Sequence, residues 1–432
     1  MQALVLSSFT LTTAAGCGNA ENIASLRHRK TGLRPNNFLD VELETWIGRV
    51  TDVEQCSLPD TLKNYQCRNN QLAYMALQND DFSIQVEQAK KKYNPSRIGV
   101  FMGTSTSGIL STELAYQKIN ATRKNNVHFQ KSVFFKEQHN SFALADFVQQ
   151  YFQLTGPAQV ISTACSSSAK VFASASQYIE LGLCDAAIVG GVDSLCLTTL
   201  YGFNSLELVA KDICRPADQN RQGLSIGEAA AFVLLEKPPA ETSSNSEGTI
   251  YLRGYGESSD AYHMSTPHPE GLGAIKAMQC ALSQAQLKSE QVDYINLHGT
   301  ATAINDQVED IAIEQVFPQH TPCSSTKGWT GHTLGAAGAV EAIYSAFCIQ
   351  NTIYPPSLNT QHIDRQFSSH IILADEQTSV LSNQGSNNSN TKTSTKELHT
   401  IASNSFGFGG NNCCLIFSDS LDNSKQHSGD KS

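Results

Sequence analysis

Three turns of this sequence carry side chains that could perform chemistry together, and the first of them holds a cysteine. Cys165 stands in the segment STACSSSAK (162–170), between a short apolar run and a stretch of small residues typical of a helix. A cysteine at the start of a helix lies at the positive end of the helix dipole, which lowers the pKa of its thiol and favours the nucleophilic thiolate. Backbone N–H groups at such a turn can also bind an oxyanion. On this turn alone, a catalytic and a buried structural cysteine are equally compatible with the sequence.

The second and third turns each carry a histidine next to a glycine. His298 follows the apolar run YINL (294–297), and His332 stands in STKGWTGHTLGAAG (325–338), five residues after Lys327. Taken singly, either histidine could be a structural or helix-capping residue, and Lys327 could be an ordinary lysine on the solvent-exposed surface.

Taken together, one cysteine and two imidazoles suit acyl transfer followed by carbanion chemistry. The cysteine supplies a nucleophile that forms a thioester. Two imidazoles can stabilise the negative charge that develops as carbon dioxide leaves and an enolate forms. A cysteine with one histidine would fit a protease or a simple acyltransferase equally well, so the second histidine favours a condensing reaction.

An α/β framework must position these turns, because short apolar runs alternate with longer helical patterns along the chain. The predicted strands are residues 97–103, 159–162, 185–190, 229–235, 249–255, 292–297, 401–403 and 414–417, and the predicted helices are residues 166–181, 271–285 and 335–350. Residues 1–17 predict a first strand and a loop rather than a signal peptide, because no basic residue precedes the apolar part.

The two parts of the chain on either side of the polar stretch 238–248 repeat one pattern. Residues 162–177 and 324–345 each predict a strand, a turn and a helix of small residues. A duplicated unit would bring the two turns together across a pseudo-twofold axis, and the small side chains would let the two helices pack closely.

We therefore predict an N-terminal half at residues 1–240 that carries the cysteine and a C-terminal half at residues 249–418 that carries both histidines. Residues 419–432 predict a disordered tail, and the polar segment 382–394 predicts a surface loop.

Composition and charge narrow the class of protein. The chain has 432 residues, 40% of them hydrophobic, and a formal net charge of -10. An acidic surface argues against a nucleic-acid binder and against a binder of anionic membranes. The 12 cysteines show no spaced secreted framework and no CxxC pair, which favours reduced thiols in a cytoplasmic protein and predicts no metal site.

Four segments resemble the signatures of β-ketoacyl-[acyl-carrier-protein] synthases of the I/II type. They are TACSSS (163–168), HGTAT (298–302) with Asp306 and Glu309 following, STKGWTGHTLGAAGAVEAI from Ser325, and NSFGFGGNN (404–412). The segment CRPADQNRQGLSIGEAAAFVLLEK from Cys214 is similar to the central part of that family, and the resemblance runs from about residue 2 to residue 418. It implies the thiolase fold, with two similar α/β halves in a five-layered αβαβα core, and a homodimer.

The resemblance implies a decarboxylating Claisen condensation. Cys165 would accept an acyl group, malonyl-ACP would lose carbon dioxide, and the carbanion would attack the Cys165 thioester to give a 3-oxoacyl-ACP. His298 and His332 would act in decarboxylation and enolate stabilisation. Lys327 would have an electrostatic and structural role, and Glu309 would order this network.

The resemblance also assigns the oxyanion hole and the entrance to the site. The N–H groups of Cys165 and Phe408 would form the oxyanion hole, and Phe408 would gate the acyl pocket. Thr300 and Thr302 would bind the amides of 4′-phosphopantetheine. That arm belongs to the acyl-carrier protein, so no dissociable cofactor is implied.

This sequence departs from the family pattern at Ala301, Asn305 and Asn411, none of which removes a catalytic group. The departures favour a specialised branch, such as polyketide or aryl-polyene synthesis, over the default of fatty-acid elongation. Acidic carrier proteins need a basic docking patch. The candidates for it are Lys63, Arg68, Arg123 and Lys124.

Three other classes of protein share parts of this pattern. A thiolase would carry a second catalytic cysteine in place of one histidine, and a synthase of the III type would carry an asparagine where His332 stands. A non-catalytic chain-length factor, which pairs with an active synthase, would lack the reactive Cys165. A heterodimer with a related synthase stays open beside the homodimer.

Overall fold

The computed structural model describes residues 1–122, 135–239, 248–375 and 397–422, and within them the two parts of the chain build sheets of identical topology. The two sheets are joined edge to edge, because β1 pairs with β10 and makes them one continuous 12-stranded sheet. In the N-terminal half the strand order is β1-β9-β7-β5-β6, and in the C-terminal half it is β10-β15-β14-β11-β12, with β13 added at the edge. Numbered along each half, both orders are first, fifth, fourth, second, third. The same neighbours are parallel and the same neighbours are antiparallel in the two halves.

The bounds of the strands follow. In the first half they are β1 (Leu4–Thr13), β5 (Ile98–Gly103), β6 (Ala158–Ile161), β7 (Ala186–Asp193) and β9 (Ala229–Glu236). In the second half they are β10 (Tyr251–Ser259), β11 (Tyr294–Asn296), β12 (Pro322–Ser324), β13 (His370–Ile371), β14 (Thr400–Gly407) and β15 (Asn411–Ser418). The short strands are β2 (Gly16–Cys17), β3 (Arg34–Pro35), β4 (Trp46–Gly48) and β8 (Ile226–Gly227).

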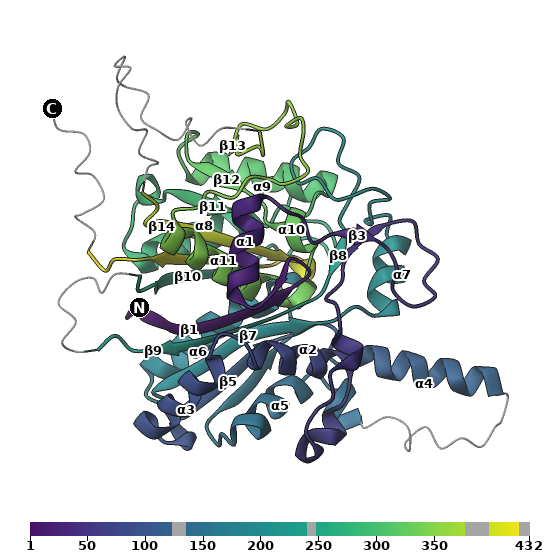
Figure 1. Cartoon of the computed structure of the whole chain (residues 1–432). Coiled ribbons are helices and arrows are strands. Elements are labelled where there is room, and N and C mark those ends of the chain that lie inside the picture. Colours follow the sequence, from purple (N-terminus) through teal and green to yellow (C-terminus); the bar gives the residue numbers. More distant parts are fainter. Residues whose placement is uncertain (123–134, 240–247, 376–396, 423–432) are drawn as a thin grey trace.

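Helices divide the molecule into five layers (Figure 1). The helices α2 (Arg68–Leu77), α3 (Phe82–Tyr93) and α5 (Ala143–Phe152) cover the outer face of the first sheet. The pair α6 (Ser167–Glu180) and α11 (Ala337–Asn351) lies between the sheets, and α8 (Leu272–Ala285) and α9 (Ala303–Val316) cover the second sheet. The remaining helices are α1 (Asn19–His28), α4 (Ile109–Thr122), α7 (Leu197–Ser205) and α10 (Lys327–Thr330). This arrangement confirms the predicted α/β thiolase fold with its five-layered core.

The central helices touch through small residues, as their composition predicts. A Cβ placed on Gly338 would lie 2.6 Å from the backbone nitrogen of Ala169, so any side chain there would push α6 and α11 apart. The Ser168 hydroxyl accepts a hydrogen bond from the N–H of Ala339 across the same contact, at 2.9 Å. The N-terminal ends of both helices are thereby held side by side at the centre of the molecule.

The sequence predictions of individual elements hold, although β14 and β15 are longer than expected and β11 is shorter. Each predicted strand and helix overlaps an observed one, and residues 1–17 form β1 and β2. The strand predicted at 401–403 extends over the whole of β14, because its main chain pairs with β15 even where polar side chains interrupt the apolar run. No helix in the described residues is long and apolar enough to cross a membrane.

The predicted disordered tail is wrong for its first residues. The N–H of Asp419 donates to the carbonyl of His399, and the Asp419 carboxylate lies 2.9 Å from Nδ1 of the same histidine. Ser420 is buried. The rest of the tail, from residue 423, and the predicted loop at 382–394 fall outside the described residues.

The predicted docking patch is wrong at Arg68. Its guanidinium is buried and donates to both carboxylate oxygens of Glu228, at 2.8 and 2.6 Å, and Glu228 is fully buried. Arg68 is therefore a partner of an interior charge and offers no surface for a carrier protein. Lys63 is exposed, and Arg123 and Lys124 lie outside the described residues.

We expect Arg68→Ala to destabilise the fold by about 3–5 kcal/mol, because it leaves the Glu228 carboxylate buried without its cation. Denaturant unfolding measures the change. Lys63→Ala is the control, and because Lys63 is exposed its effect should stay within about 0.5 kcal/mol. An Arg68→Ala protein with the stability of the wild type would contradict this assignment.

Candidate active site

The cysteine lies on a sharp turn between β6 and α6. Residues Ala164–Ser166 form one 3-10 turn that leads directly into the helix, and Ala164 has φ 53°, a left-handed conformation that is uncommon for a residue with a side chain. The Thr163 N–H donates to the Ser167 hydroxyl at 2.9 Å, which braces the turn. The backbone thus directs the side chain of Cys165 away from the sheet and toward the second half of the molecule.

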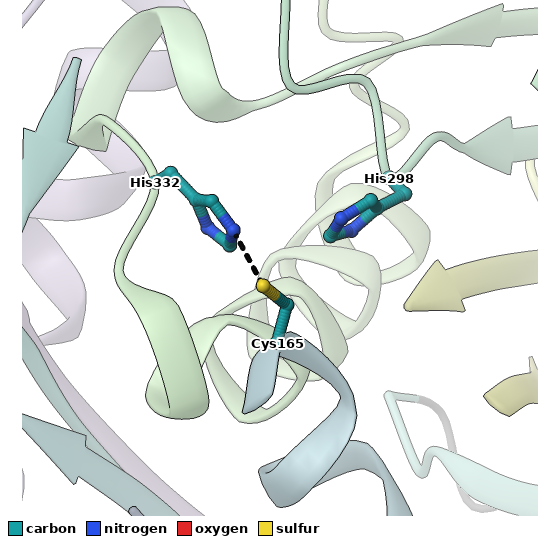
Figure 2. A group of neighbouring side chains, drawn as sticks. All are labelled: Cys165, His298 and His332. Atoms are coloured by element: carbon teal, nitrogen blue, oxygen red, sulfur yellow. Dashed lines mark hydrogen bonds between the residues drawn. The ribbon is translucent and has the colours of Figure 1, made fainter. Parts of the chain in front are cut away.

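The structure brings both predicted histidines to this thiol (Figure 2). Nε2 of His332 lies 3.0 Å from Sγ of Cys165. The ring of His298 lies 5.4 Å from the ring of His332, at an interplanar angle of 84°. The sulfur and one nitrogen of each imidazole fall within 4.8 Å of one another, so turns from opposite halves converge on a single point.

The predicted lowering of the cysteine pKa is wrong. Burial raises the pKa of the Cys165 thiol to about 11, although the charge of Lys327 and a hydrogen bond from the Phe408 N–H act in the opposite direction. Removal of the thiolate from water therefore outweighs the favourable local dipoles. The resting group is a neutral thiol hydrogen-bonded to an imidazole.

Both histidines are neutral for the same reason. Burial holds the pKa of His298 and of His332 well below the ordinary histidine value, and the charge of Lys327 lowers both further. Nδ1 of His298 lies 3.5 Å from Nζ of Lys327, which can only donate, so the lone pair is on Nδ1 and the proton on Nε2. Nδ1 of His332 is buried without a hydrogen-bond partner, so no second contact selects its tautomer.

Lys327 is itself held by a residue that the sequence analysis missed. Its Nζ lies 2.5 Å from a carboxylate oxygen of Glu341, and it also donates to the carbonyl of His298. Lys327 and Glu341 are both buried. The signal was available, because Glu341 is the one charged residue in the apolar sequence of α11.

Glu309 fixes the backbone of the His298 turn. Its two oxygens accept the N–H groups of His298 and Gly299, each at 2.8 Å, and Asn404 donates to it at 3.3 Å. The carboxylate reaches the turn from α9, one layer further out. Burial raises the pKa of Glu309 to about 7.

The thiol opens into a cavity of about 420 Å³. Thr300 and Thr302 line it with their hydroxyls 2.9 Å apart, and Phe408 lines it from the glycine-rich loop that follows β14. The ring of Phe203 lies 5.7 Å from the ring of Phe408, tilted by 33°, and was also missed, because nothing in the sequence links α7 to that loop. Of the three departures from the family pattern, Asn305 lines the cavity, while Ala301 is fully buried and Asn411 begins β15.

The burial of Glu309 generates a prediction for stability against pH. A carboxyl whose pKa rises from 4.5 when unfolded to about 7 when folded favours the fold below pH 4.5, and this contribution is lost as the pH rises through 7. We expect Glu309→Gln to lose this pH dependence. The difference in unfolding free energy between the variant and the wild type should then change between pH 4.5 and pH 7 and be constant outside that range. Denaturant titrations at several pH values measure it, and a constant difference throughout would contradict it.

Comparisons with known proteins agree with this geometry. Residues 61–240 match the N-terminal domain of beta-ketoacyl synthases, and residues 250–361 match their C-terminal domain. A mitochondrial 3-oxoacyl-[acyl-carrier-protein] synthase of Arabidopsis thaliana is 34% identical over 336 residues, which cover 74% of this chain and 68% of that protein. The 3-oxoacyl-[acyl-carrier-protein] synthase 2 of Rhizobium meliloti is 35% identical over 275 residues, and the chain spans 61% of its length.

Solved structures show the same likeness over nearly the whole chain. A ketosynthase solved in complex with its chain length factor, from Xenorhabdus doucetiae, has a TM-score of 0.83 and 36% identity, covering 96% of this chain and 98% of that one. A beta-ketoacyl synthase from Burkholderia phymatum has a TM-score of 0.81 and 25% identity, covering 97% and 99%. On these matches the chain belongs to the β-ketoacyl synthase family of condensing acyltransferases.

Proposed function

We propose that this protein is a 3-oxoacyl-[acyl-carrier-protein] synthase that condenses malonyl-ACP with an acyl group held on Cys165. One observation carries the proposal: a buried thiol 3.0 Å from one neutral imidazole, with a second imidazole beside it, at a cavity of about 420 Å³. A nucleophile and two uncharged N–H donors are what acylation followed by enolate formation requires.

In the first step Sγ of Cys165 attacks the acyl thioester of the carrier protein. Because the thiol is neutral at rest, its proton has to leave as the new C–S bond forms, and Nε2 of His332 lies within hydrogen-bond reach to take it. The N–H groups of Cys165 and Phe408 receive the oxyanion of the tetrahedral intermediate. Collapse of that intermediate releases the carrier thiol, which takes up the proton, and leaves the acyl-Cys165 thioester.

In the second step malonyl-ACP loses its carboxylate as carbon dioxide. The electron pair of the broken C–C bond moves into an enolate, whose oxygen accepts a hydrogen bond from Nε2–H of His298. His332 donates to the same oxygen in its Nε2–H tautomer, which it can adopt after the first step because no contact at Nδ1 fixes the other tautomer. The enolate carbon then attacks the carbonyl of the Cys165 thioester, the C–S bond breaks, and the Cys165 thiolate leaves and takes a proton from water. Burial keeps both imidazoles uncharged, so they can stabilise the enolate as neutral donors without capturing the carbanion as acids.

The 4′-phosphopantetheine arm would enter past Thr300 and Thr302. Their hydroxyls are paired with each other in the cavity wall, and either can turn to bind an amide of the arm. The arm remains covalently attached to the acyl-carrier protein, so the enzyme itself needs no dissociable cofactor. The pathway is proposed to be fatty-acid synthesis or a related polyketide or aryl-polyene branch, and Asn305 in the cavity wall supports a specialised substrate.

A second thiolase-fold chain is the proposed structural partner. Strand β6 ends the first sheet, and each of its residues is half-buried rather than covered. A sheet edge of this kind offers unpaired backbone groups to another strand. Oε1 of Gln159 on this strand is buried without a partner. The Xenorhabdus doucetiae ketosynthase, solved in complex with its chain length factor, supports a related chain as the partner.

The chain-length-factor alternative predicts a chain without a working nucleophile, whereas Cys165 here is hydrogen-bonded to His332. We expect Cys165→Ala to lose labelling by a cysteine-directed condensing-enzyme inhibitor. We expect Cys165→Gln to abolish condensation while malonyl-ACP decarboxylation continues, because both histidines remain. Product analysis with acyl-ACPs of varied chain length and unsaturation measures both activities. Condensation retained by the glutamine variant would refute the proposed function.

For the partner, we expect the protein isolated from its native cells to sediment as a two-chain particle and Val160→Lys to sediment as one chain, because a lysine on a sheet edge blocks pairing. Mass spectrometry then shows whether the second chain is identical or related. Leu181→Lys, at a residue that is 73% exposed, is the control. A two-chain particle retained by Val160→Lys would exclude β6 as the interface.

A further inference from the structure

The C-terminal half contains a second copy of the turn that carries the nucleophile. Leu334–Ala336 form a 3-10 turn that leads into α11, as Ala164–Ser166 lead into α6. Leu334 has φ 54°, matching the φ 53° of Ala164. The residue that follows is therefore Gly335 in one half and Cys165 in the other.

A buried carboxylate occupies this second turn. Oδ2 of Asp193 accepts the N–H of Gly335 at 2.6 Å, and Oδ1 accepts the N–H groups of Ser105 and Thr106 at 2.8 and 2.9 Å. The hydroxyls of Thr104 and Thr106 add two more hydrogen bonds, at 2.7 and 2.9 Å. Asp193 is fully buried at the end of β7.

All of these contacts present a hydrogen to Asp193. The Thr104 hydroxyl already accepts the Ser107 N–H, and the Thr106 hydroxyl accepts the Ser194 N–H, so each has its own proton free for the carboxylate. Burial raises the pKa of the Asp193 carboxyl, whereas these donors favour its ionised form. The second turn thus binds an internal anion at the start of α11, where the helix dipole also favours negative charge.

We propose that Asp193 is a positioning residue that sets the distance between Cys165 and His332. It holds the His332 turn directly through Gly335, three residues further along the chain. It holds the Cys165 turn through Ser105, whose hydroxyl donates to the carbonyl of Ala164 at 3.5 Å. A second anchor fixes the backbone of His332: its N–H donates to the carbonyl of Ser225, and its carbonyl accepts the N–H of Gly227 in β8.

This inference deepens the proposed function, because it concerns the same thiol and imidazole. Asp193→Asn keeps the shape of the side chain but turns an amide N–H toward one of the backbone donors, which pushes the Gly335 or the Ser105 turn away. A displacement near 1 Å costs on the order of 10²-fold in rate. We expect kcat for condensation to fall by about that factor while KM for the carrier-bound substrate is unchanged.

A double-mutant cycle separates positioning from charge and from stability. The rate of Cys165 alkylation by iodoacetamide is measured for the wild type, Asp193→Asn, His332→Ala and the double variant. The negative charge of Asp193 raises the pKa of Cys165, so Asp193→Asn lowers that pKa through charge alone. This effect of charge on the alkylation rate is the same with His332 and with His332→Ala. We expect the effect of Asp193→Asn to differ by roughly tenfold between the two backgrounds, because the part transmitted through His332 is lost in His332→Ala.

Asp218→Asn is the matched control. Asp218 is 1% exposed and accepts three backbone N–H groups, from Asn220, Gln361 and His362, away from both turns. Asp218→Asn should lower the free energy of unfolding and leave kcat and the rate of Cys165 alkylation unchanged. The proposal would be overturned if Asp193→Asn changed the alkylation rate by the same factor in the wild-type and His332→Ala backgrounds, and if its kcat equalled that of Asp218→Asn.

Gly335→Ala carries the test if Asp193→Asn does not fold. The added methyl would lie 2.8 Å from Oδ2 of Asp193 and 2.7 Å from the Ser105 hydroxyl, so it displaces the turn without changing any charge. We expect slower alkylation and the same loss of kcat, and wild-type values for both would reject the inference. The alkylation cycle needs no carrier protein, so an inactive wild type in the condensation assay would count against the proposed function and leave this result intact.

Discussion

The close contact of α6 with α11 is the constraint on which the rest of the structure depends. Gly338 lies directly against Ala169 at the crossing and leaves no room for a side chain of its own, so the N-terminal turns of the two helices lie side by side. The two helices belong to different halves of the chain, and their contact therefore joins the halves at the point where the thiol and the imidazoles meet. A larger residue at Gly338 would separate the sheets and the reacting groups together.

Burial then sets the chemistry of the convergent groups. A thiol in water would ionise more readily, and an imidazole in water would be partly protonated, whereas here both are held neutral. The buried cation beside them, Lys327, is balanced by Glu341 in the same interior. The interior thus favours imidazoles that donate hydrogen bonds as neutral groups over imidazoles that act as charged acids.

The two halves share one topology but use the turn before the central helix differently. In the first half the turn before the central helix presents Cys165, and in the second half the same turn presents Gly335 to Asp193. In the proposal, the Asp193 carboxylate bound in the second turn fixes the position of that turn relative to Cys165 in the first. The predicted α/β framework, the thiol and both histidines came from local patterns, because apolar runs, glycine-flanked turns and small-residue helices leave a signal in adjacent residues.

The sequence by itself determined which residue types stand at the turns, that two similar halves carry them, and that the family resemblance extends over nearly the whole chain. Only the tertiary structure decided that the thiol is neutral, that Arg68 is an interior partner of Glu228, and that Glu341, Phe203 and Asp193 belong around the site. These properties depend on burial and on contacts between segments far apart in the chain. A pKa or a pairing of that kind is set by what surrounds a side chain in space, and neighbours along the sequence do not encode it.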